Sequence, residues 1–268
     1  MHWVIGDIHG MLGPLESVLE AVHRADGSAQ VYFTGDYVNR GPESRRVIEL
    51  LLSLSGARFL RGNHDDIFGQ VLYGQTYCPN ASRGRRLVAF QWFMQFGLES
   101  TLRSYGVDGG DLARLMHRPS VRALDSALAC VPESHRRFIR GLEAVIEEDD
   151  FYVGHGKWEP EKADNPLSIA QQLAEEGSSR YAMLWGRFRS EEITGPKAWH
   201  RTGYFGHTSV ECYPELQSGD GPVPICGPRA VLLDTGAALS PGGRLTAFCH
   251  ETQRCVQASH FGEMIGPG

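Results

Sequence analysis

The chain has 268 residues, of which 41% are hydrophobic and 22% charged, and its formal net charge is −6 at pH 7. These values are ordinary for a globular protein, and the length suits one sizeable domain with a full hydrophobic core. The negative charge argues against a general nucleic-acid-binding protein or a membrane-surface protein. A site for an anion would therefore have to be positive locally.

No apolar run approaches the roughly 20 residues that a membrane helix requires, and the first predicted strand starts within the first few residues. This leaves no room for a signal peptide, so we expect a cytoplasmic protein. The six cysteines contain no Cys-x-x-Cys pair and are predicted to be reduced thiols.

Short apolar runs alternate with helical segments over the first sixty residues, a pattern typical of βαβ units. Strands are predicted at 3–5, 31–33 and 58–60, with helices over 15–22 and 47–54 between them. Each strand leads directly into a polar, glycine-flanked string. The chemistry is thus expected where strands end, which is where open α/β sheets usually bind ligands.

Residues 67–150 are predicted to form a helical insert beside the active site. Apolar residues at helical spacing predict one helix over 87–98 and another over 138–146, just before the next strand. The aromatic residues of the first helix are interpreted as core rather than as a ligand-binding box: Phe90, Trp92, Phe93 and Phe96.

After residue 151 the chain reads as β structure, with short runs separated by loops that contain glycine and proline. Strands are predicted at 151–153, 203–205, 230–233 and 245–248. No internal repeat or linker interrupts the chain. We therefore interpret residues 1–268 as a single domain.

The most informative feature is a set of short, polar strings spread over the chain. Together they supply two aspartates, one asparagine and three histidines, which suit two divalent transition metals. Asp7 and His9 lie two residues apart at a strand end, so their side chains leave on the same side and can reach one metal. The strings are Gly6–Gly10, Gly35–Gly41, Gly62–Asp65, Gly154–Gly156 and Gly206–Thr208.

In this order and spacing, the strings resemble those of the phosphoprotein phosphatase family of metallophosphoesterases, in particular bacterial and bacteriophage lambda-type serine/threonine phosphatases. The similarity continues in Leu184–Arg187, Leu233–Ala237 and Gly243–Ala247. The resemblance implies an α/β calcineurin-like fold, in which two mixed β-sheets pack as a sandwich between helices. It covers residue 4 to about residue 248.

The resemblance also implies two metal sites that share one bridging carboxylate, that of Asp36. The expected metals are Mn²⁺, with iron, zinc or magnesium as alternatives. The implied reaction is hydrolysis of phosphate monoesters by direct attack of a hydroxide that bridges the two metals. The implied ligands are Asp7, His9 and Asp36 for the first metal, and Asp36, Asn63, His155 and His207 for the second.

Four residues match family positions that contact the substrate phosphate. Arg40 and Arg187 would clamp its oxygens, a task that suits a planar guanidinium. Asn63 lies beside them, and His64 matches the histidine that protonates the leaving oxygen. Arg189 is an alternative to Arg187, because it lies two residues away.

One position departs from the family pattern. The second string usually ends Asp-Arg-Gly, but Asn39 occupies the place of the aspartate that supports the general-acid histidine. A neutral Asn39 would orient His64 but would stabilise its imidazolium less, so protonation of the leaving group should be weaker.

The function that the sequence favours is a serine/threonine protein phosphatase, supported by Leu184–Arg187 and Gly206–Thr208. A dinucleoside polyphosphate hydrolase of the diadenosine tetraphosphate type, or an RNA 5'-end phosphohydrolase, is the alternative, because Asn39–Pro42 resembles those relatives. An inactive phosphate-binding module and an engineered Asp→Asn substitution also remain open. The expected partner is a phosphorylated protein or small molecule, without membrane or general nucleic-acid binding.

Overall fold

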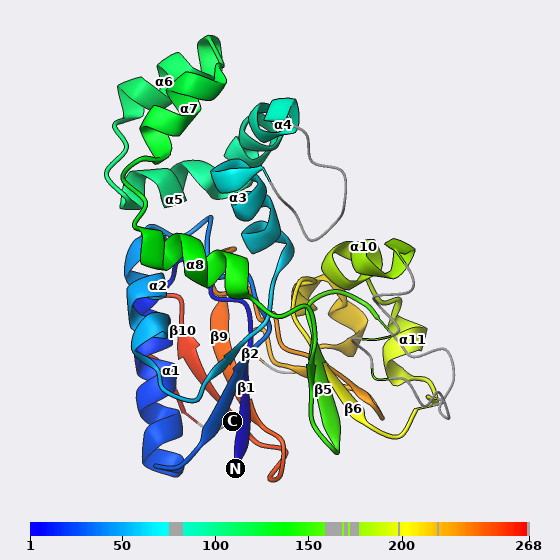
Figure 1. Ribbon diagram of the computed structural model, residues 1–268. Helices are drawn as coiled ribbons and strands as arrows, with labels where there is room; N and C mark the ends of the chain where they lie inside the picture. The colour runs from blue at the N-terminus through cyan, green and yellow to red at the C-terminus, as the bar shows by residue number, and fades with distance from the viewer. Residues whose placement is uncertain are drawn as a thin grey trace.

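The computed structural model describes residues 1–74, 83–158, 168, 171, 177–197, 199–218 and 220–266. Its strands form two mixed sheets, which confirms the predicted fold class (Figure 1). The six-stranded sheet has the order β11 (Met264–Ile265), β10 (Cys255–Ser259), β9 (Arg244–Cys249), β1 (His2–Ile5), β2 (Gln30–Phe33) and β3 (Arg58–Phe59). The five-stranded sheet has the order β4 (Ile146–Glu147), β5 (Phe151–Gly154), β6 (Thr202–Phe205), β8 (Ala230–Leu232) and β7 (Ile225–Cys226).

Each sheet combines three parallel strands with antiparallel strands. In the first, β1, β2 and β3 run parallel, while β9 is antiparallel to β1. In the second, β5, β6 and β8 run parallel, while β4 and β7 are antiparallel to their neighbours. The parallel strands of each sheet therefore place their carboxyl ends together at one edge.

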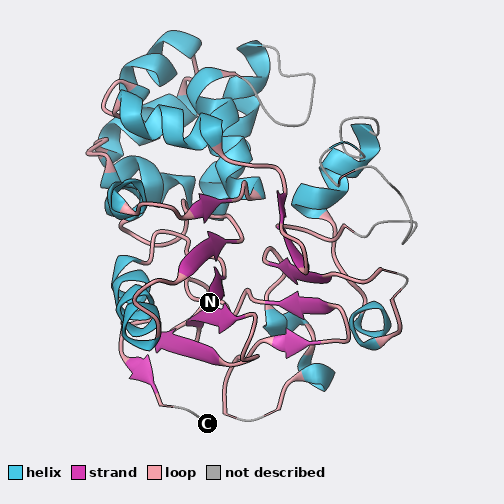
Figure 2. Ribbon diagram, turned by 60° about the horizontal axis from the view of Figure 1, so that its bottom comes forward, coloured by secondary structure: helices cyan, strands magenta, loops and turns pink. Residues whose placement is uncertain are grey.

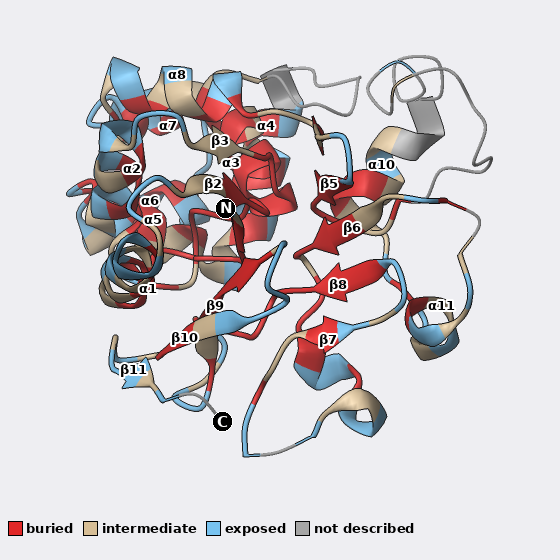
Figure 3. Ribbon diagram, turned by 90° about the horizontal axis from the view of Figure 1, so that it is seen from below, coloured by how far each residue is buried: buried red, intermediate tan, exposed pale blue. Residues whose placement is uncertain are grey.

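The residues of β1 show how the strands divide the core between layers. Because successive side chains of a strand point to opposite faces, Trp3 and Ile5 join the cluster under α1 (Leu12–Ala25) and α2 (Ser44–Ser53). Val4 instead joins a cluster between the two sheets, together with Tyr204 of β6. Figure 2 shows the strands in the middle of the molecule with helices outside them, and Figure 3 shows that most of the central strands are buried.

The second sheet is covered on its outer side by a third cluster. Phe188 and Ile193 pack there against Phe205. The short helices of this half are α10 (Gly177–Trp185), α11 (Ser190–Thr194), and the 3-10 turns η2 (Val210–Cys212) and η3 (Pro214–Leu216). The helix, sheet, sheet and helix layers expected from the sequence are thus present.

The helical insert starts earlier and ends earlier than predicted. Its helices are α3 (Asn63–Tyr73), α4 (Arg83–Phe93), the π-helical turn η1 (Met94–Leu98), α5 (Glu99–Ser104), α6 (Gly109–His117), α7 (Val121–Leu128) and α8 (Glu133–Gly141). The predicted helix over 138–146 was wrong in its second half, because Leu142 is extended and Ile146 pairs with Val153 in the second sheet. Figure 1 shows α6 and α7 farthest from the sheets.

The predicted helix over 87–98 contains a break. Phe96 and Gly97 leave the helical conformation inside η1, and Gly97 has a φ of 91°. The interpretation of the aromatic residues as core holds for Phe90 and Phe93, which are buried, but was wrong for Trp92 and Phe96, which are exposed. Trp92 lies off the buried face of the helix, and the π turn changes the direction of Phe96.

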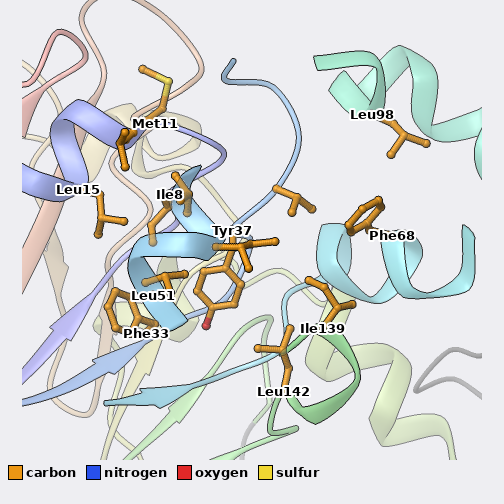
Figure 4. Packing of buried hydrophobic residues seen from close by; sticks show 14 of the residues in the cluster. Ile8, Met11, Leu15, Phe33, Tyr37, Leu51, Phe68, Leu98, Ile139 and Leu142 are labelled. Atoms are coloured by element: carbon orange, nitrogen blue, oxygen red, sulfur yellow. The ribbon is translucent and has the colours of Figure 1, made fainter. Parts of the chain in front are cut away.

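Tyr37 links the insert to the first sheet. Its ring lies in the cluster with Phe33, Leu51 and Ile139 (Figure 4), and its hydroxyl donates to the carbonyl of Leu60 at 2.8 Å. Burial of its apolar body together with a satisfied hydroxyl keeps the loop after β2 in one position. No helix in the described part of the chain is long and apolar enough to cross a bilayer.

Candidate active site

The six candidate metal ligands come from loops that follow the carboxyl ends of five parallel strands. Asp7 and His9 follow β1, Asp36 follows β2, Asn63 follows β3, His155 follows β5 and His207 follows β6. All are buried except His207, which is half-buried. The fold therefore brings together ligands that are up to 200 residues apart in the sequence.

The backbone of these loops is strained at the candidate site. Six non-glycine residues in the described part of the chain have positive φ, and only one of them, Gln253, lies away from the site. Such conformations cost about 1–3 kcal/mol each and persist only where the surrounding structure imposes them. The other five are His9 (47°), Asp36 (57°), Asn39 (72°), Arg40 (65°) and His207 (66°).

Asp65 holds part of this strained backbone. Its fully buried carboxylate accepts hydrogen bonds from the backbone N–H groups of Asp36 at 2.7 Å, and of Tyr37 and Gly62 at 3.0 Å each. Burial and the charge of Asp36 raise the pKa of Asp65 to about 7. Asp65 was not among the predicted site residues, because its backbone partners depend on the tertiary fold.

The ligand atoms converge on Asp36. Its Oδ2 lies 3.4 Å from Nε2 of His9, and its Oδ1 lies 3.4 Å from Nε2 of His155. The Oδ1 of Asn63 lies 2.9 Å from Nε2 of His155 and 3.0 Å from Nδ1 of His207. One carboxylate thus separates two groups of ligand atoms, as a bridging ligand would.

The hydrogen bonds of the two histidines indicate that a cation belongs between these atoms. Nδ1 of His9 lies 3.0 Å from the carbonyl of Val38, and Nδ1 of His155 lies 2.8 Å from that of Thr34. A carbonyl only accepts, so Nδ1 carries the proton in each neutral ring and Nε2 presents a lone pair. These lone pairs face the oxygens of Asp36, and a metal ion would satisfy both sides.

The charges of the site give the same indication. Burial lowers the pKa of a histidine, yet the carboxylates of Asp36 and Asp7 raise the pKa of His155 to about 10. Burial raises the pKa of Asp36, but the nearby His155 and His64 lower it well below its usual range. The negative charge of the two carboxylates thus favours a positive charge at this position, which a metal ion would supply.

Asp7 and Asp234 are two buried carboxylates of the site whose charges interact. Asp7 accepts from the hydroxyl of Thr34 at 2.8 Å and from the backbone N–H of His207 at 2.9 Å, so it connects both sheets. Burial and the charge of Asp234 raise the pKa of Asp7. Asp234 is buried beside the ligands and was not among the predicted site residues, although the string Leu233–Ala237 contains it.

His64 is held by Asn39 and by aromatic packing. Nδ2 of Asn39 lies 2.9 Å from Nδ1 of His64, while Oδ1 of Asn39 accepts from the hydroxyl of Thr101 at 2.9 Å. With its oxygen bonded to Thr101, the amide donates to His64, so Nδ1 accepts and the neutral ring carries its proton on Nε2. Burial lowers the pKa of His64 to about 4.

The catalytic pocket opens above these residues and has a volume of about 80 Å³. Arg40 and Arg187 both line it, whereas Arg189 is exposed and forms ion pairs with Glu191 at 3.4 Å and Glu192 at 3.3 Å. The geometry therefore favours Arg187 over Arg189 as the second phosphate-binding residue. The complete lining is Asp36, Arg40, Asn63, His64, Phe93, Phe96, Trp185, Arg187 and His207.

Residues 2–129 match the family model for calcineurin-like phosphoesterases. This part of the chain is therefore similar to a calcineurin-like phosphoesterase domain. Similar sequences include proteins named symmetrical bis(5'-nucleosyl)-tetraphosphatase from Coxiella burnetii, 40% identical over 63 residues, and from Cellvibrio japonicus, 30% identical over 142 residues. These matches cover 24% and 49% of this chain, and only 22% and 50% of the relatives.

Solved structures of phosphoesterases share the fold over nearly the whole chain. A protein described as a candidate diadenosine tetraphosphatase has a TM-score of 0.51 at 20% identity, over 96% of this chain and 92% of that chain. A cold-active protein tyrosine phosphatase has a TM-score of 0.53 at 15% identity, over 98% of this chain and 77% of that chain. At these identities the likeness establishes only the calcineurin-like fold.

Among the residues that the structure describes, the groups of His, Cys, Asp and Glu that could share a metal ion all lie at this site. One contains His9, Asp36 and His64, and the other contains Asp7, Asp36 and His155. Calcineurin-like phosphoesterases use divalent metals, and these residues suit them.

Proposed function

We propose that the protein is a two-metal phosphohydrolase. The observation that supports this most strongly is the position of the Asp36 carboxylate, 3.4 Å from Nε2 of both His9 and His155. Two divalent cations bound there would neutralise charge on a phosphoryl group and acidify a water molecule. Asp7, His9 and Asp36 would hold one, and Asp36, Asn63, His155 and His207 the other, with Mn²⁺ as the expected metal.

The protein's own residues would position the substrate. Arg40 and Arg187 line the pocket from two separate loops, so their guanidinium groups would bind different oxygens of one phosphate. Nδ1 of His64 is bonded to Asn39, which leaves Nε2 as the nitrogen that we assign to the leaving oxygen. Phe93 packs edge-on against His64 with ring centroids 5.0 Å apart and limits rotation of the imidazole.

The Asn39–His64 contact favours phosphoanhydride substrates over alkyl phosphates. A neutral imidazole donates a hydrogen bond but is a weak acid, and no carboxylate supports its charged form at this position. A phosphate leaving group departs without a full proton, whereas the alkoxide of serine needs one. We therefore propose a nucleoside polyphosphate as substrate, in agreement with the names of the relatives.

A serine/threonine phosphatase is the second candidate function, although the sequence alone ranks it first. It is supported by the placement of Trp185 and Arg187 in the pocket, since Leu184–Arg187 resembles that branch of the family. In this case His64 would receive its proton in the enzyme–substrate complex.

A substrate panel in the presence of Mn²⁺ tests both candidates. We expect diadenosine tetraphosphate to be hydrolysed faster than a phosphoserine peptide by the unmodified protein. Asn39→Asp should speed hydrolysis of the peptide by about tenfold or more, because a general acid contributes about 10²–10⁴, while an aryl phosphate should gain little. The gain should appear in kcat rather than KM.

Two outcomes would overturn the first proposal. Faster hydrolysis of the peptide by the unmodified protein, with no gain from Asn39→Asp, would establish the phosphatase instead. Failure to hydrolyse any member of the panel, with metals bound, would indicate a phosphate-binding module.

A further inference from the structure

The catalytic pocket is too small for a whole substrate. Its volume of about 80 Å³ lies far below the range of about 300–1,000 Å³ for sites that enclose small molecules. It has room for a phosphoryl group between Arg40 and Arg187. The rest of any substrate must therefore lie on the rim of this pocket.

One side of the rim consists of aromatic side chains. Phe96 and Trp185 line the pocket itself, and Trp92 and Tyr181 extend the surface outward. The exposed fractions are 40% for Phe96, 44% for Trp92 and 63% for Tyr181. Clustered exposed aromatics on a soluble protein commonly mark a binding surface. We call these four residues the aromatic platform.

The rings of the platform are arranged for stacking. Trp185 is nearly parallel to Trp92, with centroids 5.7 Å apart at 22°, and to Tyr181, with centroids 6.3 Å apart at 19°. Phe96 stands edge-on to Trp92 at 5.8 Å. Trp92 comes from α4, whereas Trp185 and Tyr181 come from α10, so the platform joins two distant segments of the chain.

The platform is linked to the phosphate-binding residues by short segments of the chain. Trp185 lies two residues before Arg187 on the same segment. Phe96 precedes Gly97, whose carbonyl accepts a hydrogen bond from the backbone N–H of Arg40 at 3.3 Å. A side chain at Gly97 would collide with the backbone of Arg40. The backbone of Arg40 is therefore held next to Phe96, and Arg187 is close to Trp185 in the chain.

We propose that the aromatic platform stacks a planar aromatic group of the substrate, and that this group is a nucleobase; the identity of the substrate rests on the proposed function. A phenyl ring bonded directly to a phosphate oxygen would stay beside the pocket, where it reaches Phe96 and Trp185. A base separated from its phosphate by a ribose also reaches Trp92 and Tyr181, which do not line the pocket.

Binding of adenosine monophosphate, phenyl phosphate and ribose 5-phosphate to the metal-loaded protein tests this proposal. Calorimetry should show that Trp92→Ala and Tyr181→Ala each weaken binding of adenosine monophosphate by about fivefold to a hundredfold, because stacking of one base contributes about 1–3 kcal/mol. Trp92→Phe should recover most of this affinity. Leu52→Ala is the matched control, because Leu52 is also 44% exposed but lies at the far end of α2.

Tryptophan fluorescence gives a second measurement. Trp3, Trp158 and Trp199 are buried, with exposed fractions of 4–8%, so a stacked base should quench chiefly Trp92 and Trp185. Adenosine monophosphate should therefore quench the emission, and ribose 5-phosphate should not.

The proposal is overturned if the Trp92→Ala and Tyr181→Ala variants bind adenosine monophosphate as tightly as the unmodified protein. It is also overturned if their affinity for ribose 5-phosphate falls by the same factor as their affinity for adenosine monophosphate. A loss confined to phenyl phosphate would reassign the platform to an aryl ester such as phosphotyrosine and exclude the nucleobase. None of the three ligands contains a phosphoanhydride bond, so these binding results are independent of whether the protein hydrolyses phosphoanhydrides.

Discussion

The proposed metal centre and the aromatic platform lie side by side but are built in different ways. The centre is buried, its ligands follow the ends of parallel strands, and its backbone is held in strained conformations by groups such as Asp65. The platform is exposed and comes from two helices that meet only through tertiary packing. Buried hydrogen bonds hold the first region in place, whereas the second is open to solvent and leaves room for substrates to differ.

This difference separates catalysis from substrate choice. The residues around Asp36 are suited to hydrolysis of a phosphoryl group and carry no information about what that group is attached to. We propose that substrate choice depends instead on Asn39 and the platform. Asn39 keeps His64 a weak acid, which disfavours alkyl phosphates, and the platform contacts the part of the substrate beyond the phosphate. Changes in the centre should therefore affect stability and all substrates, and changes on the rim should affect affinity for particular substrates.

The largest effect is expected at Asp65, which supports the centre. Asp65→Ala leaves three buried N–H groups without their acceptor, and each unsatisfied donor costs about 1–3 kcal/mol. The free energy of unfolding should fall by about 3 kcal/mol or more, measured by urea denaturation. Asp65→Asn keeps one carbonyl oxygen and should lose less. Equal stability of all three proteins would show that Asp65 does not hold the loop after β2.

A smaller effect, on phosphate binding alone, is expected at Arg187 in the pocket. Arg187→Ala removes a charge-assisted contact worth about 1.5–3 kcal/mol, so inhibition by inorganic phosphate should weaken by about tenfold to a hundredfold, with metal content unchanged. Arg189→Ala is the control, because Arg189 is paired with Glu191 and Glu192. If the Arg189 variant shows the loss instead, the assignment of the two arginines must be exchanged.

The fold could be predicted where the pattern is local. The alternation around β1, β2 and β3 and the helices between them were all found, because strand ends, glycines and apolar spacing are visible within a few residues. The end of α8 was missed because Ile146 belongs to β4 only through its pairing with Val153. The strand β10 was missed in the same way, since it is defined by pairing with β9.

The same distinction between local pattern and tertiary contact applies to the residues of the candidate site. Its proposed ligands could be located because each belongs to a short string after a strand. Asp65 and Thr101 could not be assigned, because their partners are backbone atoms or an amide that only the folded chain brings near. Trp92 was misread as core although it lies off the buried face of its helix, and Phe96 was misread because periodicity cannot anticipate the π turn at Met94–Leu98.

The central claim is that Asp36 is shared by two metal ions, and metal content measures it most directly. Elemental analysis of the Mn²⁺-loaded protein should give two equivalents per chain. His207→Ala should retain about one, because His207 is assigned to the second site alone, whereas Asp36→Ala should lose both because each site depends on that carboxylate. A full equivalent retained by the Asp36→Ala variant would contradict the shared site.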